Sequence, residues 1–293
     1  MPRDELLTVG EAFEDLIFFG LARLPGPGEE VKTSSFLRTF GGGAVITAVA
    51  ASRLGLRCRI LSGLSPAAVL RLRKENVRVS NVRRPEEPYA LSAALSTRDN
   101  RSFVTYNGIN DSLEERLLEP SRRASARHVH FAFYPADCAR WEAVVGGLRR
   151  RGVTTSWDFG WNEGLLSDPG FEPLLRALDY VSINEGECLL YARESGMAAA
   201  VRYWQASCRN VLVKLGPQGC KWITPAGRLR APACRACVVD TTGAGDAFNG
   251  GVLFALLSGR PARQCLRIAN RVGALSTRMA GGIDGLPRRD EII

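Results

Sequence analysis

The sequence predicts one α/β domain with a mostly parallel central sheet, helices on both faces of that sheet, and a small β-sheet lid. Two observations lead to this fold class. Short apolar segments alternate with helical segments along most of the 293-residue chain, which is the pattern of parallel strands joined by helices. Several of these segments are continuous apolar runs, as expected of strands buried on both faces. A chain of this length removes roughly 75% of its unfolded surface from water, which allows a large core.

The first half of the chain contains four expected strands and two expected helices. The strands are the short apolar runs 6–9, 59–62, 129–133 and 153–157. The small, apolar stretch 42–54 is expected to be helical, because Gly55 can end it. Residues 138–151 are expected to form a second helix. Asp137 can cap its first turn, and Gly152 can end it.

The second half continues the alternation. Its expected strands are 180–183, 211–215 and 238–239. An apolar helix is expected over 248–257, because Gly259 follows it closely. Pro261 suits the first turn of a last helix that runs to about Arg278. The whole chain, 1–293, is therefore expected to fold as a single domain.

Residues 12–40 and 85–107 interrupt this rhythm. Both stretches show shorter alternations of apolar and polar residues, separated by Pro and Gly turns. Such patterns are typical of half-buried strands rather than of central parallel ones. We therefore expect the two stretches to form a smaller sheet that acts as a lid over the strand ends.

Composition excludes several classes of protein. The net charge is +9, from 39 basic and 30 acidic residues, but the arginines are scattered and no nucleic-acid partner is expected. No apolar run reaches the roughly 18 residues of a membrane span, and the N-terminus lacks a signal-peptide pattern. The eight cysteines are irregularly spaced, apart from Cys234 and Cys237. The cysteine pattern predicts reduced thiols in a cytoplasmic protein. The absence of a long apolar run predicts that the protein has no membrane partner.

The segment 240–251, D-T-T-G-A-G-D-A-F-N-G-G, is the most informative part of the sequence. Gly243, Ala244 and Gly245 have no bulky side chains, so their backbone N–H groups can converge on an anion at a helix N-terminus. Asp246 would repel a bound phosphate unless it has a task, such as taking a proton from an attacking hydroxyl. Phosphoryl transfer needs this combination of a base and fixed donors. We therefore predict that these four residues are catalytic.

The segment closely resembles the signature D-T-x-G-A-G-D-x-F of the ribokinase-like (PfkB) carbohydrate kinases, and the resemblance extends over nearly the whole chain. The other matching features are Asp15 after Gly10-Glu11, the turn Gly41–Gly43 with its helix, Arg101 with Thr105, Tyr106 and Asn110, the N-x-x-E pair Asn184 and Glu187, and Asn270. The resemblance implies ATP-dependent phosphorylation of a hydroxyl on a small sugar or sugar-like substrate, as in fructokinases and ribokinases. It also implies a homodimer formed through the lid.

Site residues follow from these matches and from the turns around them. The expected substrate-binding residues are Asp15, Gly41, Gly42, Gly43 and Arg101. The expected nucleotide-binding residues are Asn184, Lys214, Gly216, Gly219 and Asn270. Glu187 would hold Mg²⁺ through water, and the same residue with Asn184 also fits a helix capping box. The resemblance further implies a monovalent cation, K⁺, at Asp240 and Thr242 with carbonyls near Gly281 and Gly282.

Two departures from the family pattern concern the sugar site. Ile46 stands where many members carry a sugar-contacting asparagine, and an unpaired sugar hydroxyl there would cost about 1–3 kcal/mol. The usual G-x-D-x-x-G segment is shortened in the 63–68 loop, which lacks the aspartate and the second glycine. These departures leave two alternatives open. One is a nucleoside or deoxy-sugar-acid kinase of the same family, and the other is a nucleotide- or sugar-binding sensor with little turnover.

Overall fold

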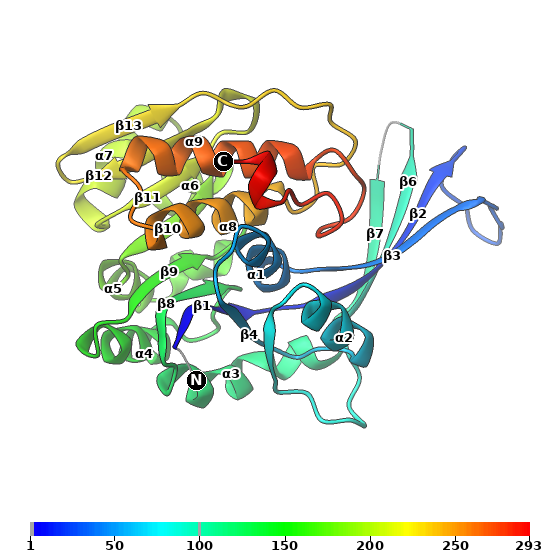
Figure 1. Ribbon diagram of the computed structural model, residues 1–293, viewed down its shortest axis with the longest axis horizontal. Coiled ribbons are helices and arrows are strands. Elements are labelled where there is room, and N and C mark those ends of the chain that lie inside the picture. The colour runs from blue at the N-terminus through cyan, green and yellow to red at the C-terminus, as the bar shows by residue number, and fades with distance from the viewer. Residues whose placement is uncertain (1–2, 99–100) are drawn as a thin grey trace.

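The computed structural model describes residues 3–98 and 101–293, and within them a nine-stranded sheet forms the centre of the protein (Figure 1). The strand order is β13-β12-β11-β10-β9-β8-β1-β4-β5. These strands are β1 (Asp4–Gly10), β4 (Cys58–Ser62), β5 (Arg78–Asn81), β8 (Ala126–Ala132), β9 (Thr154–Asp158), β10 (Tyr180–Asn184), β11 (Val211–Lys214), β12 (Cys220–Thr224) and β13 (Gly227–Ala231). Neighbours pair in parallel except at β12 and β13, which form an antiparallel edge. The predicted α/β fold with a mostly parallel sheet is confirmed.

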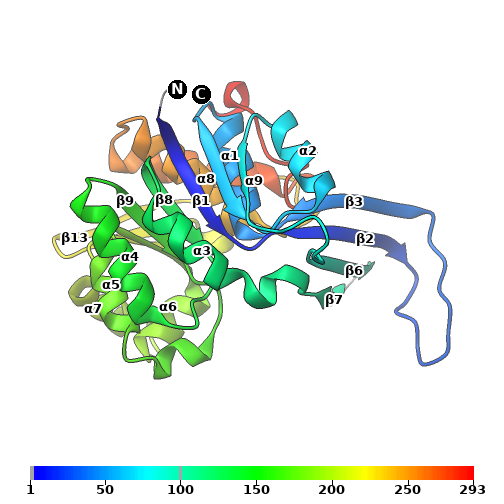
Figure 2. The same cartoon turned by 90° about the horizontal axis from the view of Figure 1, so that it is seen from below.

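Helices cover both faces of this sheet. They are α1 (Gly43–Arg53), α2 (Pro66–Lys74), α3 (Leu113–Arg122), α4 (Cys138–Arg150), α5 (Phe171–Ala177), α6 (Glu185–Ala192), α7 (Met197–Ser207), α8 (Ala244–Leu257) and α9 (Ala262–Ser276). Helices α1, α2, α8 and α9 pack into one core, and α3 to α7 pack into a second core on the opposite face (Figure 2). Successive residues of a strand point to opposite faces, so Leu6 of β1 lies in the first core and Leu7 in the second. Among the described residues, no helix has the length and apolar character that crossing a membrane requires.

A separate small sheet projects from the body of the protein (Figures 1 and 2), and we call it the lid. Its strands are β2 (Phe13–Leu21), β3 (Ser35–Gly41), β6 (Leu91–Thr97) and β7 (Arg101–Tyr106), in the order β3-β2-β6-β7. Strand β2 pairs antiparallel with β3 and parallel with β6, and β7 pairs antiparallel with β6. The lid strands therefore come from the two stretches that interrupt the main rhythm of the sequence, with β3 running one residue past 12–40.

The carboxyl ends of the parallel strands meet at one edge of the central sheet. Gly10 ends β1, Asp158 ends β9, Asn184 ends β10 and Lys214 ends β11. From β1 the chain passes directly into the lid strand β2. Ligands of open α/β sheets bind outside this edge. The fold thus places several polar residues where a site is expected.

One expected strand, 238–239, is not formed, and that prediction was wrong. Val238 and Val239 are 60% and 63% exposed. The N–H groups of Val239 and Asp240 both donate to the carbonyl of Thr277, at 2.8 and 3.0 Å. These groups therefore bond to the end of α9 instead of to a neighbouring strand, and the segment is a loop.

Helix α8 begins at Ala244, earlier than the expected range 248–257, because Gly243 adopts a left-handed conformation (φ 73°) directly before it. The helix also packs closely against α1. A Cβ atom on Gly250 would lie only 2.5 Å from the Cβ atom of Ala50. This close contact fixes the position of the glycine-rich segment relative to α1.

Replacing Gly250 by Ala should destabilise the protein, because the added methyl group overlaps Ala50. Overpacking of this kind costs about 1–3 kcal/mol, so we expect scanning calorimetry to show a Tm lowered by several degrees. Gly146→Ala in α4 is the matched control, since a Cβ atom there would meet only the Arg150 guanidinium, at 3.6 Å. The control should leave Tm unchanged or raise it slightly, because Ala favours helix over Gly. Equal effects of the two substitutions would contradict the close contact.

Candidate active site

Residues 241–246, which we call the anion loop, comprise the turn before α8 and the first residues of that helix. Gly243 is required there for two reasons: its φ is 73°, and a Cβ atom on it would lie 2.5 Å from Cδ1 of Ile46. The first N–H groups of a helix have no acceptor within the helix. Together with the helix dipole they favour a bound anion. Gly243, Ala244 and Gly245 thus lie at a helix start, as the sequence analysis expected.

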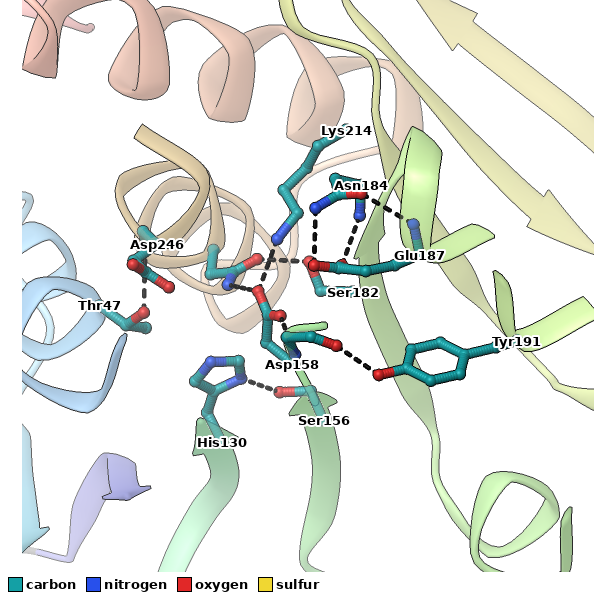
Figure 3. A network of polar contacts seen from close by, with 12 residues as sticks. Thr47, His130, Ser156, Asp158, Ser182, Asn184, Glu187, Tyr191, Lys214 and Asp246 are labelled. Carbon is teal, nitrogen blue, oxygen red and sulfur yellow. Dashed lines mark hydrogen bonds and ion pairs between the residues drawn. The ribbon is translucent and has the colours of Figure 1, made fainter. Parts of the chain in front are cut away.

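Asp246 lies in the first turn of α8 and faces α1. A Cβ atom on Gly43 would lie 3.1 Å from its Oδ1 atom, and the hydroxyl of Thr47 donates to its backbone carbonyl at 3.1 Å (Figure 3). Burial and, to a smaller extent, the Asp158 carboxylate raise the pKa of Asp246 to about 7, against the opposing effect of the Lys214 ammonium group. A carboxylate that titrates near physiological pH is suited to accept a proton in a reaction.

The glycine turn 41–43 connects Asp246 with a second carboxylate, Asp15, on the lid. A Cβ atom on Gly41 would lie 2.3 Å from Oδ2 of Asp15, so this close approach requires glycine. Burial and, to a smaller extent, the charge of Asp240 together raise the pKa of Asp15 to about 7. The structure therefore brings together the two carboxylates and the glycines that sequence analysis assigned to catalysis and substrate binding.

Two further polar residues lie near this turn. Gly42 has a φ of 94°, and a Cβ atom on it would lie 2.5 Å from the backbone oxygen of Glu11. Burial raises the pKa of the Glu11 carboxyl group. Asn110 donates from Nδ2 to the carbonyl of Ala12 at 3.4 Å, while its buried Oδ1 has no partner in the described part of the chain. Oδ1 of Asn110 is thus an available acceptor close to the glycine turn.

A cavity of about 860 Å³ opens on the other side of the anion loop. Four of the residues predicted to bind nucleotide line it: Lys214, Gly216, Gly219 and Asn270. Asn184 lies outside the lining, at the end of β10. Ligand pockets of this size commonly hold a molecule as large as a nucleotide.

The loop 232–238 forms a further wall of this cavity that sequence analysis missed. Asn270 of α9 holds it, since its Nδ2 atom donates to the carbonyls of Ala231 at 3.3 Å and Pro232 at 2.7 Å. The available signal was the apolar Val238, which the sequence analysis interpreted as part of a strand. In the structure it is exposed at the cavity wall.

A buried ion pair lies beside the anion loop (Figure 3). The Nζ atom of Lys214 is 2.5 Å from Oδ2 of Asp158. Asn249 of α8 donates to the same oxygen at 2.7 Å, and the hydroxyl of Ser182 donates to Oδ1 of Asn249 at 2.5 Å. Burial opposes charge on both partners, but their attraction outweighs it, lowering the pKa of Asp158 and raising that of Lys214. A Cβ atom on Gly245 would lie 3.3 Å from Nζ, so the ammonium group borders the anion loop.

The predicted capping box of Asn184 and Glu187 is present at the start of α6. Glu187 accepts from the backbone N–H of Asn184 at 2.8 Å and from its Nδ2 atom at 2.6 Å, and Asn184 accepts from the N–H of Glu187 at 2.9 Å. Burial raises the pKa of Glu187, and the charge of Asp158 raises it further. Asp158, Glu187 and Asp246 thus share one ammonium group, that of Lys214.

This surplus of negative charge fits a hydrated Mg²⁺ ion that arrives with nucleotide phosphates. Nowhere in residues 3–98 or 101–293 do three His, Cys, Asp or Glu side chains group closely enough to hold a metal directly. Mg²⁺ commonly retains several waters and takes one or two carboxylates together with substrate phosphates. Glu187 can contribute such a carboxylate through water.

Arg101 reaches from the lid to the base of the anion loop. Its Nη1 atom donates to Oδ1 of Asp240 at 2.8 Å and to the hydroxyl oxygen of Thr242 at 2.5 Å. Asp240 and Thr242 therefore already have a cationic partner from the lid. Sequence analysis named all three residues but did not foresee this contact.

The chain is similar to known proteins along most of its length. The family model described as pfkB family carbohydrate kinase matches residues 3–289. The chain is 28% identical to a protein named uncharacterized sugar kinase YegV of Escherichia coli, over 99% of this chain and 94% of that protein. It is also 28% identical to 2-dehydro-3-deoxygluconokinase of Bacillus subtilis, over 89% and 87%. A structure of a putative ribokinase II from E. coli in complex with ATP and Mg²⁺ is similar in fold, with a TM-score of 0.82 and 22% identity over 99% of this chain and 97% of that one.

Asp246→Asn should stabilise the protein at neutral and higher pH. The folded state raises the pKa of this carboxyl group from 3.8 to about 7, so wild-type stability falls as pH rises through that interval. An amide does not ionise, and we expect the variant to be more stable at pH 8 by on the order of 4 kcal/mol and nearly equal to the wild type near pH 4.

Urea unfolding at several pH values measures this difference. Asp290→Asn is the control, because that side chain is exposed near the C-terminus. The control should keep the wild-type pH dependence. If Asp246→Asn also kept it, the carboxyl group would not be perturbed as described.

Proposed function

The chain belongs to the pfkB family and is an ATP-dependent carbohydrate kinase, and we propose that its acceptor is a small sugar or sugar-like molecule, as for fructokinases and ribokinases. The position of Asp246 is the observation that supports this proposal most directly. Its carboxylate lies against the glycine turn 41–43, while its own loop borders the cavity of about 860 Å³. The carboxyl group of Asp246 is thus next to both the proposed sugar site and the proposed ATP site.

In this proposal the acceptor is held between Asp15 and the glycine turn 41–43. Asp15 accepts hydrogen bonds from sugar hydroxyls, and Oδ1 of Asn110 offers another acceptor. Asp246 takes the proton of the attacking hydroxyl, which makes that oxygen a better nucleophile. The lid excludes water from the reacting groups, so that ATP is not hydrolysed wastefully.

ATP occupies the large cavity in this proposal, with its phosphates at the anion loop. The backbone N–H groups of residues 243–246 stabilise the charge on the transferred group, and Lys214 adds a fixed positive charge beside them. Glu187 would hold Mg²⁺ through water, and the ion would neutralise charge on the phosphates. The similar ribokinase II structure, described as a complex with ATP and Mg²⁺, supports this assignment. A monovalent cation is not included, because Asp240 is already paired with Arg101.

We also propose that two copies of the chain associate through their lids. Three large apolar side chains of the edge strand β7 are exposed: Phe103 (56%), Val104 (68%) and Tyr106 (55%). An edge strand of this kind tends to be covered.

All eight cysteines are free thiols, six of them buried, which suits the reducing cytoplasm.

A deoxy-sugar acid is the second candidate acceptor. The alignment with the relative named 2-dehydro-3-deoxygluconokinase covers 89% of this chain, at 28% identity. Ile46 offers no hydrogen bond at the position of the usual asparagine, which suits an acceptor with one hydroxyl fewer. The panel described next includes both classes of acceptor.

The purified protein should release ADP from Mg·ATP when the correct acceptor is present. We would measure ADP across a panel of sugars, sugar acids and nucleosides, and expect one class to stimulate turnover. Asp246→Asn should lower kcat by about 10²–10⁴-fold, the usual contribution of a general base. Asp15→Asn should mainly raise KM for the acceptor, because it removes a binding contact.

Asp290→Asn, at an exposed position, controls for unspecific effects and should retain full turnover. Calorimetric titration with ATP checks that Asp246→Asn still binds nucleotide. If no acceptor raises ADP release although ATP binds, the proposed class of acceptor is contradicted and the alternative of a sensor with little turnover is favoured. Equal turnover of wild type and Asp246→Asn would exclude this residue as the base.

The pH dependence of turnover should reflect two carboxyl groups. Asp246 acts as a base only when ionised, and Asp15 binds hydroxyls best in the same form. Their pKa values are both raised to about 7, so kcat/KM for the acceptor should rise with pH up to about 7 and then level off. The rise should be steeper than that for a single proton. A profile that is flat between pH 5 and 8 would contradict this interpretation.

A further inference from the structure

The lid carries a fixed positive charge to the base of the anion loop. Arg101 opens strand β7, and its partner Asp240 lies 139 residues further along the chain. The Nη1 atom of Arg101 donates to both Asp240 and Thr242, and its Nε atom donates to the hydroxyl of Ser96 on β6 at 3.1 Å. The guanidinium group is thus held at both ends, by the lid and by the base of the anion loop.

Asp240 is a buried carboxylate whose two oxygens both accept N–H donors. Its side chain is 2% exposed. Besides Arg101, the backbone N–H of Thr242 donates to Oδ1 at 2.8 Å, and that of Gly281 donates to Oδ2 at 3.1 Å. Burial works against the charge of Asp240, but these hydrogen bonds outweigh it and lower its pKa. The carboxylate is therefore ionised, and its charge is balanced by Arg101.

The residues expected to hold a monovalent cation do not fit one in this structure. A cation needs oxygen lone pairs that point toward a common centre. Gly281 turns its N–H group, rather than its carbonyl, toward Asp240. The hydroxyl oxygen of Thr242 accepts from Arg101. The donors around Asp240 thus present positive charge where a cation would have to lie.

Ile46 adds an apolar wall at the same place. It is 2% exposed. Its Cδ1 atom would lie 2.5 Å from a Cβ atom on Gly243 and 2.8 Å from one on Gly282. The side chain therefore fills the space between the anion loop and the turn 281–282, where the remaining cation ligands were expected.

We propose that Arg101 is a built-in cation that replaces a monovalent metal ion at Asp240, so that this kinase orders its anion loop without added K⁺. The inference rests on the proposed function, because it concerns the same phosphate site. Arginine stays charged at all relevant pH values and holds a carboxylate in a fixed geometry. Arg101 is a positioning residue in this scheme, since it acts on the anion loop through Asp240.

A consequence follows for the lid. The charge of Asp240 is balanced only while β7 lies against the core. Opening the lid would leave a buried carboxylate without its cation, which is unfavourable. Arg101 therefore favours the closed lid as well as the ordered loop.

The first test compares the wild-type protein in KCl, NaCl and tetramethylammonium chloride at equal ionic strength. Two quantities are measured. Calorimetric titration gives the affinity of the protein for the Mg²⁺ complex of a non-hydrolysable ATP analogue, and scanning calorimetry gives Tm without nucleotide. We expect the affinity to change less than about twofold among the salts, because screening is the same at equal ionic strength. We also expect Tm to be the same in all three salts. The proposal would be overturned if K⁺ alone raised Tm or raised the affinity, by about tenfold, and if the increase saturated with K⁺ concentration.

The second test replaces Arg101. Arg101→Gln should weaken analogue binding about tenfold, because a buried charge loses its partner. Arg101→Lys keeps the charge and should lose only about threefold. Arg98→Gln, an exposed arginine just after β6, is the matched control and should bind as the wild type does.

Each result decides for or against the inference. Equal binding by Arg101→Gln and Arg98→Gln would overturn it, as would equal losses in the Gln and Lys variants. If Arg101→Gln fails to fold, the comparison of salts on the wild type still decides. Failure of the proposed function would show separately, as absence of acceptor-dependent ADP release, and would leave the Tm comparison among salts valid.

Discussion

The attraction between Lys214 and Asp158 is the interaction on which the arrangement of the site depends. It joins the ends of β11 and β9, which are not neighbours in the sheet, because β10 lies between them. The oxygen that accepts from Lys214 also accepts from Asn249, so the same pair ties the sheet to the helix that carries Asp246. Buried charges are costly unless they are paired and hydrogen-bonded. Without the ammonium group, the carboxylates of Asp158, Asp246 and Glu187 would repel one another at the very place where phosphates have to bind.

His128 and His130 lie deeper in the sheet, and they do not change this balance of charges because both are neutral. Burial lowers the pKa of His128 to about 3 and that of His130 to about 4. The imidazole of His128 lies 2.7 Å from the hydroxyl of Ser156 through Nε2, and that of His130 lies at the same distance through Nδ1 (Figure 3 shows the latter). Both histidines hydrogen-bond to Ser156 inside the sheet without adding positive charge beneath Asp158, while the buried Nε2 atom of His130 has no partner among the described residues. Lys214 therefore remains the ammonium group that the carboxylates of the site share, and its position decides where phosphate oxygens are attracted.

The parts of the site that were predictable from the sequence are those formed by neighbours in the chain. Small residues, a left-handed glycine and an apolar helix follow one another in the anion loop, and the capping box of α6 spans a single helical turn. The ion pair of Asp158 and Lys214 joins residues 56 apart, and that of Arg101 and Asp240 joins residues 139 apart. No local pattern records such contacts, because only the folded chain brings the partners together. The strand expected at 238–239 failed for the related reason that two valines carry too little information to distinguish a strand from a cavity wall.

The lid brings charges of both signs to the site, and the two signs have different tasks. Arg101 on β7 pairs with Asp240, whereas the pKa of Asp15 on β2 is raised by burial and, in addition, by the negative charge of the same Asp240. The first contact attracts the lid to the core, and the second repels it as long as Asp15 is ionised. An acceptor that donates hydroxyl hydrogen bonds to Asp15 stabilises the ionised carboxylate and so offsets part of the free-energy cost of this repulsion. In the proposed mechanism closure is therefore favoured by Arg101 before the acceptor binds, and choice among acceptors depends on how well their hydroxyl groups satisfy Asp15 and Asn110.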